Sequence, residues 1–184
     1  MKKWLKRIGL VVAALILLPL MTLFALGLRP GAGHLQASAE IQASPETLWA
    51  WIDDGDRLKQ WVSWTEKVTP WSPQAGVGAK RALTMRDENN GGMLMTIDTA
   101  CTEYMPPKTL SVHMTTAGEF DGQQTYRLTG LGSGRTRIEV SSKYHFSNPM
   151  IQLLEPLVTP SARKKLEGDI ARLKMLAETS AELR

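Results

Sequence analysis

The C-terminal stretch over residues 149–183 contains the most regular amphipathic pattern in the chain. Four apolar residues recur at steps of four, three and four, which is one stripe of a helix: Leu166, Ile170, Leu173 and Ala177. Such a helix is stabilised mainly by burying its stripe, because isolated helices are marginal in water. The strand-like segments before it are the only partner long enough to cover it. The sequence therefore predicts one sheet wrapped on one long helix.

Period-two alternation predicts the strands of that sheet. They are expected over residues 34–42, 65–71, 79–86, 93–102, 110–115, 120–128 and 136–146. Ser44 followed by Pro45 is typical of a helix start, so a short helix should follow the first strand, and a second is expected over 58–62. The order is strand, two short helices, six strands and long helix, which predicts an α+β domain with an antiparallel sheet. Pro156 and Pro160 should kink the first half of the long helix.

Residues 8–28 form a run of 21 without a single charge. About 20 apolar residues span a bilayer core, so this run predicts a transmembrane helix. Four basic residues precede it and favour a cytoplasmic N-terminus: Lys2, Lys3, Lys6 and Arg7. Without these four, the 22 basic and 18 acidic residues become 18 of each, which removes the main support for nucleic-acid binding.

The predicted organisation is an N-terminal signal anchor over residues 1–29 and a globular domain over 30–184. The domain would then face the periplasmic or extracellular side. A cleaved signal peptide is the alternative, because Ala37-Ser38-Ala39 has the small-x-small form of a cleavage site. That tripeptide lies inside the first predicted strand, which favours the uncleaved anchor. The linking residues 29–33 reach at most about 18 Å, so the domain should lie against the membrane surface.

Four sequence pieces sit at the joints of these elements: Ile41-x-Ala43-Ser44-Pro45-Glu46-x-x-Trp49, Asp54-x-x-x-Leu58-x-x-Trp61, Gly76-Val77-Gly78 and Leu166-Glu167-x-Asp169-Ile170-x-x-Leu173-Lys174. With this element order, the chain resembles the START-like, or helix-grip (SRPBCC), superfamily in its polyketide cyclase/dehydrase and lipid-transport branch, over residues 34–180. The resemblance implies a seven-stranded sheet curled around the long helix, with a cavity for an apolar ligand between them. No catalytic motif of the family transfers residue by residue.

The residues expected to line this cavity are Trp61, Met85, Met95, Val112, Met114, Tyr126, Ile170 and Leu173. Methionine is adaptable and common on surfaces that accept varied apolar ligands, although each of these residues could equally be ordinary core. Arg86 and His113 are the polar candidates for orienting a head group at the cavity mouth.

Five tryptophans fall within residues 49–71. Trp49 and Trp61 are expected in the core. Trp51, Trp64 and Trp71 are predicted either to form an exposed aromatic cluster, as at a membrane interface or a ligand mouth, or to be partly buried between helix and sheet.

Candidates for catalysis and metal binding are weak. Six titratable residues could serve in a cavity, and none forms a pair by spacing: Asp98, Glu103, His113, Tyr126, Tyr144 and His145. The three histidines lack metal-ligand spacing, and the single cysteine, Cys101, has no neighbour that would activate it. We therefore expect no metal, no cofactor and no catalytic residue.

The sequence favours a membrane-anchored binding protein for a hydrophobic small molecule or lipid, with its oligomeric state open. A cyclase/dehydrase-type enzyme acting on a hydrophobic substrate and a non-binding envelope interaction domain remain as alternatives.

Overall fold

The computed structural model describes residues 2–27, 33–74, 76–87, 91–116 and 120–182. The elements follow in the predicted order: α1 (Lys2–Gly27), β1 (His34–Ile41), α2 (Pro45–Asp53), α3 (Gly55–Trp61), β2 (Thr65–Val68), β3 (Lys80–Asp87), β4 (Met93–Met105), β5 (Thr109–Thr116), β6 (Phe120–Gly132), β7 (Arg135–Phe146) and α4 (Pro149–Glu182).

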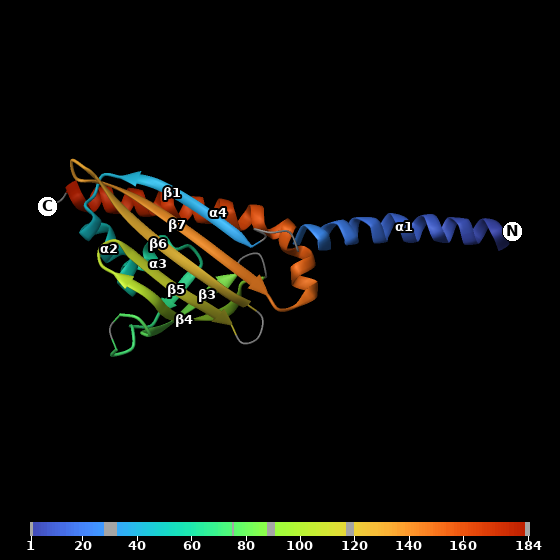
Figure 1. Ribbon diagram of the computed structural model, residues 1–184, viewed down its shortest axis with the longest axis horizontal. Coiled ribbons are helices and arrows are strands. Elements are labelled where there is room, and N and C mark those ends of the chain that lie inside the picture. Colours follow the sequence, from blue (N-terminus) through green and yellow to red (C-terminus); the bar gives the residue numbers. More distant parts are fainter. Residues whose placement is uncertain (1, 28–32, 75, 88–90, 117–119, 183–184) are drawn as a thin grey trace.

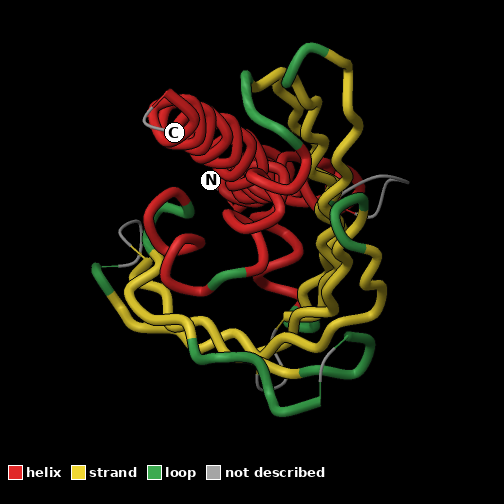
Figure 2. Tube along the Cα trace, turned by 90° about the vertical axis from the view of Figure 1, so that its left-hand side faces the viewer, coloured by secondary structure: helices red, strands yellow, loops and turns green. Residues whose placement is uncertain are grey.

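The seven strands form one antiparallel sheet in the order β1-β7-β6-β5-β4-β3-β2. Figure 2 shows the sheet as an arc that partly encloses the helices. The stripe of α4 packs into this arc, with Ile170, Leu173 and Ala177 buried against the inward residues Ile138 and Val140 of β7. The predicted helix-grip α+β fold is therefore confirmed. β2 is a short edge strand whose register with β3 is irregular between Thr65 and Lys67.

Two capping residues fix the short helices after β1. The Ser44 hydroxyl accepts a hydrogen bond from the Thr47 amide at 3.2 Å, as predicted, and Pro45 occupies the first turn of α2. The Asp54 carboxylate accepts hydrogen bonds from the amides of Asp56 and Arg57, which starts α3 earlier than the predicted residue 58. Because α3 contacts both β2 and α4, the two helices close the gap between the far edge of the sheet and the long helix.

α4 contains both predicted kink sites, Pro156 and Pro160. In Figure 1 the first turns of α4 lie across the direction of the rest of the helix. Each proline removes one intrahelical hydrogen bond, and this explains the change of direction.

α1 contains a stretch, Lys6–Leu26, that is long and apolar enough to cross a membrane, and its side chains are not buried. A signal sequence near the N-terminus would have the same properties. Figure 1 shows α1 projecting from one end of the domain, along its long axis. The predicted boundary between residues 29 and 30 falls within 28–32, outside the described residues.

Candidate ligand cavity

A cavity of about 260 Å³ lies between the concave face of the sheet and the helices α3 and α4. Its wall is mainly apolar, and β3, β4, β5 and β6 all contribute inward-facing side chains. Binding cavities for drug-sized ligands usually measure about 300–1,000 Å³, so the volume of this one lies just below that range. It has room for a compact molecule or for part of a chain.

Six of the predicted cavity residues are brought together on this wall: Trp61, Met85, Met95, Val112, Met114 and Tyr126. Val112 and Met114 share one face of β5 because alternate strand residues point the same way. The structure places Ile170 and Leu173 elsewhere: both are buried in the core beside the cavity and neither reaches its wall.

Arg86 and His113 lie on the outer face of the sheet, away from the cavity. Arg86 donates to a Glu66 carboxylate oxygen and to the Gly92 carbonyl, and His113 Nε2 is 2.8 Å from Asp121 Oδ2. Arg86 follows the inward-facing Met85, and His113 precedes the inward-facing Met114. Because successive residues of a strand point to opposite faces of the sheet, both side chains point outward.

Three charged cavity residues were not expected from the sequence: Arg81, Lys165 and Asp169. Asp169 is buried on α4. One of its carboxylate oxygens is 2.7 Å from Lys165 Nζ and the other accepts a hydrogen bond from the Ser63 amide at 3.0 Å. This carboxylate therefore ties α4 to the segment after α3. The sequence pattern could have identified Asp169 as a candidate, because it lies three residues after Leu166 and therefore beside the apolar stripe of the helix.

Arg81 lies on β3 at an inward position and is only 6% exposed. Its Nη1 donates to the Asp53 carbonyl at 2.9 Å, and its guanidinium carbon is 4.0 Å from the centre of the Trp71 ring. Burial lowers the pKa of Arg81, although arginine remains protonated in proteins. The cavity wall thus includes a desolvated cation.

The sequence did not decide whether Trp51, Trp64 and Trp71 are exposed. In the structure they do not form an exposed cluster. Trp51 is buried, Trp71 is partly buried beneath Arg81, and Trp64 is partly buried on the cavity wall with Lys165 over its ring. Trp64 also has a φ of 71°, a left-handed conformation that is uncommon for a bulky residue and tends to occur at functional sites. The expected core residues Trp49 and Trp61 are buried.

Among the titratable candidates, Tyr126 alone lies on the cavity wall. Asp98 and His145 are exposed, Glu103 accepts a hydrogen bond from Ser111, and the Tyr144 hydroxyl is 3.2 Å from that of Thr159. Cys101 is buried, and burial raises its thiol pKa, which makes it a poor nucleophile. No group of three His, Cys, Asp or Glu residues suited to a metal ion occurs among the residues described.

Burial raises the pKa of Tyr126 to about 12, opposed in part by the nearby positive charge of Arg81. In the unfolded chain a tyrosine loses its proton near pH 10. Folding must therefore hold the proton on Tyr126 between these values, and the free energy of unfolding should fall by up to about 3 kcal/mol as pH rises from about 10 to about 12. Urea unfolding of the wild type and of Tyr126→Phe across this range should show a shallower decline in the variant. Parallel pH profiles would contradict the expectation.

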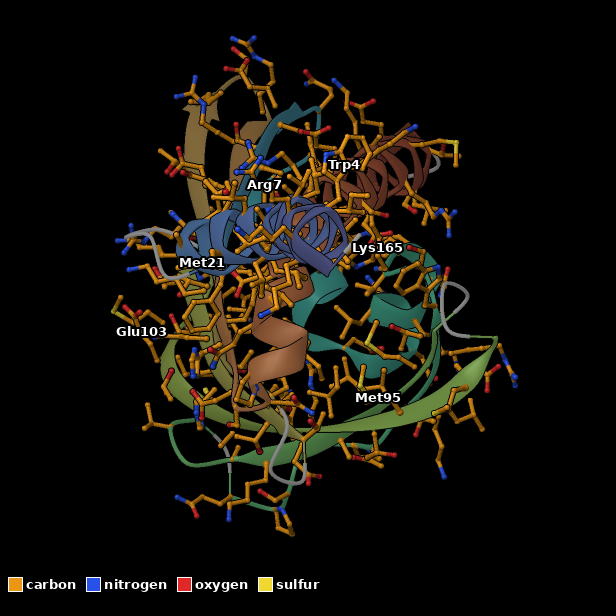
Figure 3. The ribbon with its side chains drawn as sticks, turned by 90° about the vertical axis from the view of Figure 1, so that its right-hand side faces the viewer. Trp4, Arg7, Met21, Met95, Glu103 and Lys165 are labelled. Atoms are coloured by element: carbon orange, nitrogen blue, oxygen red, sulfur yellow. The ribbon has the colours of Figure 1, made fainter. Side chains whose placement is uncertain are left out.

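The cavity extends toward the end of the domain from which α1 projects. Met85, Met95, Met114 and Phe120 all lie near the strand ends on that side, together with the start of β1. Figure 3 views this end along α1 and labels Met95 on the sheet and Lys165 on the helical side of the interior. Met93 and Leu94, which begin β4 there, are exposed.

A sequence profile of the family described as "Polyketide cyclase / dehydrase and lipid transport" matches residues 32–178. That range holds all seven strands and most of α4. No curated protein matches the chain.

Several solved structures have the same fold at low sequence identity. TTHA0849 from Thermus thermophilus is 16% identical, with a TM-score of 0.66, over 80% of this chain and 98% of its own. The Zhui aromatase/cyclase from Streptomyces sp. R1128 is 15% identical, with a TM-score of 0.64, over 79% and 93%. CV1439 from Chromobacterium violaceum is 15% identical, with a TM-score of 0.61, over 79% and 98%.

Proposed function

Because this chain belongs to the polyketide cyclase/dehydrase and lipid transport family, we propose that it binds a hydrophobic small molecule or lipid in the cavity between the sheet and α4. The observation that carries the proposal is the cavity itself, a mainly apolar space between the concave face of the sheet and the helices. Burial of apolar surface contributes about 25 cal/mol per Å², so a ligand that buries a few hundred Å² gains several kcal/mol relative to water. Transfer of the same ligand from a bilayer into the cavity changes the free energy by close to zero, because both surroundings are apolar. Such a ligand can therefore exchange reversibly between the bilayer and the cavity.

The proposal includes attachment to a membrane through α1. The methionine-rich end of the cavity and α1 lie at the same end of the domain, so a tethered domain would present its cavity to the bilayer. Met93, Leu94, Leu157 and Val158 are exposed apolar residues that suit contact with lipid there. The basic residues before the span favour a cytoplasmic N-terminus, with the domain on the periplasmic or extracellular side.

An uncleaved anchor is favoured by the pairing of β1. Ala37 and Ala39, the small residues of the candidate cleavage site, pair with Val140 and Ile138 of β7. Cleavage after Ala39 would remove most of an edge strand and expose part of the core.

A cyclase- or dehydrase-type enzyme is the second candidate function. The observation in its favour is that Tyr126 is a titratable group on an apolar cavity wall that also carries the charged side chains of Arg81 and Asp169, where burial can tune proton transfer by the tyrosine. Loss of turnover with retained binding in Tyr126→Phe would favour the enzyme.

The test is to fill the cavity. The full chain, extracted with its surrounding lipid into polymer-bounded nanodiscs, is compared with Met114→Trp and with the control Thr115→Trp. Met114 faces the cavity, whereas its neighbour Thr115 lies on the outer face of β5. Ligands are released by organic extraction and counted by mass spectrometry against the lipid of empty discs.

We expect a defined apolar compound near one per chain in the wild type and in Thr115→Trp, and its loss in Met114→Trp. A wild-type protein that carries nothing and takes up no apolar fluorescent probe would refute the proposal and favour an interaction domain.

A further inference from the structure

Arg81 is a buried cation on the cavity wall, and none of the described residues forms an ion pair with it. No carboxylate among the described residues lies within 4.0 Å of its nitrogen atoms. Its Nη1 and Nη2 donate to the carbonyls of Asp53 and Ile52, and its Nε has no hydrogen-bond partner in the part of the chain that the structure describes. Burying a guanidinium with one N–H group that lacks an acceptor costs folding free energy. We therefore expect another group to offset that cost.

The neighbouring charges supply only part of that compensation. Lys165 and Asp169 neutralise each other across 2.7 Å. Asp53 favours the charged form of Arg81 from beyond ion-pair distance, but its two carboxylate oxygens accept hydrogen bonds from Trp71 and Tyr104 rather than from the guanidinium. The described charges on the cavity wall therefore sum to one positive charge, located at Arg81.

Arg81 also has a structural role, because Ile52 and Asp53 are the last residues of α2. A cation at a helix C-terminus satisfies free carbonyls and interacts favourably with the helix dipole. This role accounts for the Nη contacts. It leaves the Nε–H group and the net charge of the cavity unexplained.

The cavity has a polar and an apolar end. On β3, Arg81 and Met85 are inward residues four positions apart, so they are about 13 Å apart along the strand, and Met85 lies toward α1. Tyr126 and Gln124, which are hydrogen-bonded to each other, add polar atoms to the wall. At about 260 Å³ the space suits one apolar chain rather than two.

From these observations we propose that the cavity takes a single-chain amphiphile with an anionic head group, which lies at Arg81 while the chain extends toward the methionines near α1. This proposal rests on the proposed function and names its ligand class. The anion supplies the acceptor for Arg81 and cancels the charge of the cavity. A carboxylate and a phosphate share this chemistry.

The experiment compares three probes of equal chain length: dodecanoate, dodecyl phosphate and dodecanol. The full chain in phosphatidylcholine nanodiscs is dialysed against each probe. Empty nanodiscs measure the amount of probe that dissolves in the lipid alone. Charge-assisted hydrogen bonds predict that at least one anion binds about 10–100-fold more tightly than the alcohol. The anion that is preferred identifies the head group.

The variant Arg81→Met should reduce the preference to near onefold, and Arg81→Lys should retain part of it. Arg127→Met, an exposed arginine beside Tyr126 on β6, is the matched control and should leave the preference unchanged. Because the readout is a ratio between probes, a purely structural loss would lower all three affinities together and leave the ratio intact.

Equal binding of alcohol and anions by the wild type would overturn the role of Arg81 and leave the proposed function standing. Binding of none of the three would count against both. The wild-type comparison decides the question even where Arg81→Met does not fold, and a preference that survives in a folded Arg81→Met would also overturn the proposal.

Discussion

Replacing Trp61 with alanine is expected to lower the free energy of unfolding by about 3–5 kcal/mol, because a large buried ring leaves a void that its neighbours cannot fill. Trp61 is 1% exposed. Its Nε1 donates to the Trp51 carbonyl at 2.9 Å, which joins α3 to α2, and its ring meets the edge of Tyr126 at a centroid distance of 6.3 Å. Chemical unfolding followed by circular dichroism measures the effect.

The matched variant is Trp61→Phe, which retains most of the ring and loses the N–H donor. The Trp51 carbonyl then lacks its partner, so this change should cost about 1–3 kcal/mol. If alanine cost no more than phenylalanine, the packing of the indole would not be what stabilises this joint.

The second large effect is expected for Asp169→Ala, at about 3 kcal/mol of unfolding free energy. Removal of one partner of a buried ion pair costs about 3–5 kcal/mol, and the lower end applies because Lys165 is partly exposed. The Ser63 amide also loses its acceptor. Urea unfolding at neutral pH is the measurement.

Glu40→Ala is the control, because Glu40 pairs with Arg137 at the same distance of 2.7 Å on the surface. Exposed pairs contribute little, so this variant should unfold close to the wild type. Equal losses in the two variants would mean that burial of the Asp169 pair is irrelevant to its effect.

The sequence predicted the framework because its patterns are local. The stripe containing Ile170 and Leu173 identifies its own buried face, and Ser44-Pro45 determines a helix start within four residues. The turn between β6 and β7 was harder to predict from the sequence. Ser133 and Gly134 both take a positive φ, which lets the strands continue to Gly132 and from Arg135, beyond the predicted strand ends at residues 128 and 136.

The polar part of the cavity could not be derived in the same way. Strand alternation places Arg81 on the face of Met85, but a charged residue there is unusual unless distant groups accept its hydrogen bonds. Those groups are the carbonyls that end α2 and the Trp71 ring, and only the tertiary structure brings them to β3. The same alternation places Arg86 on the outer face, where the structure has it.

The shortness of β2 matters for crowding. A sheet edge presents unpaired amides and carbonyls that invite strands from other molecules. Copies anchored in one bilayer as proposed would share an orientation and meet repeatedly, which favours edge-to-edge polymerisation. At one edge β1 lies against α4; at the other, β2 has four residues, an irregular register and an exposed lysine, Lys67. The domain therefore gives a passing copy almost no template for a continuous intermolecular sheet.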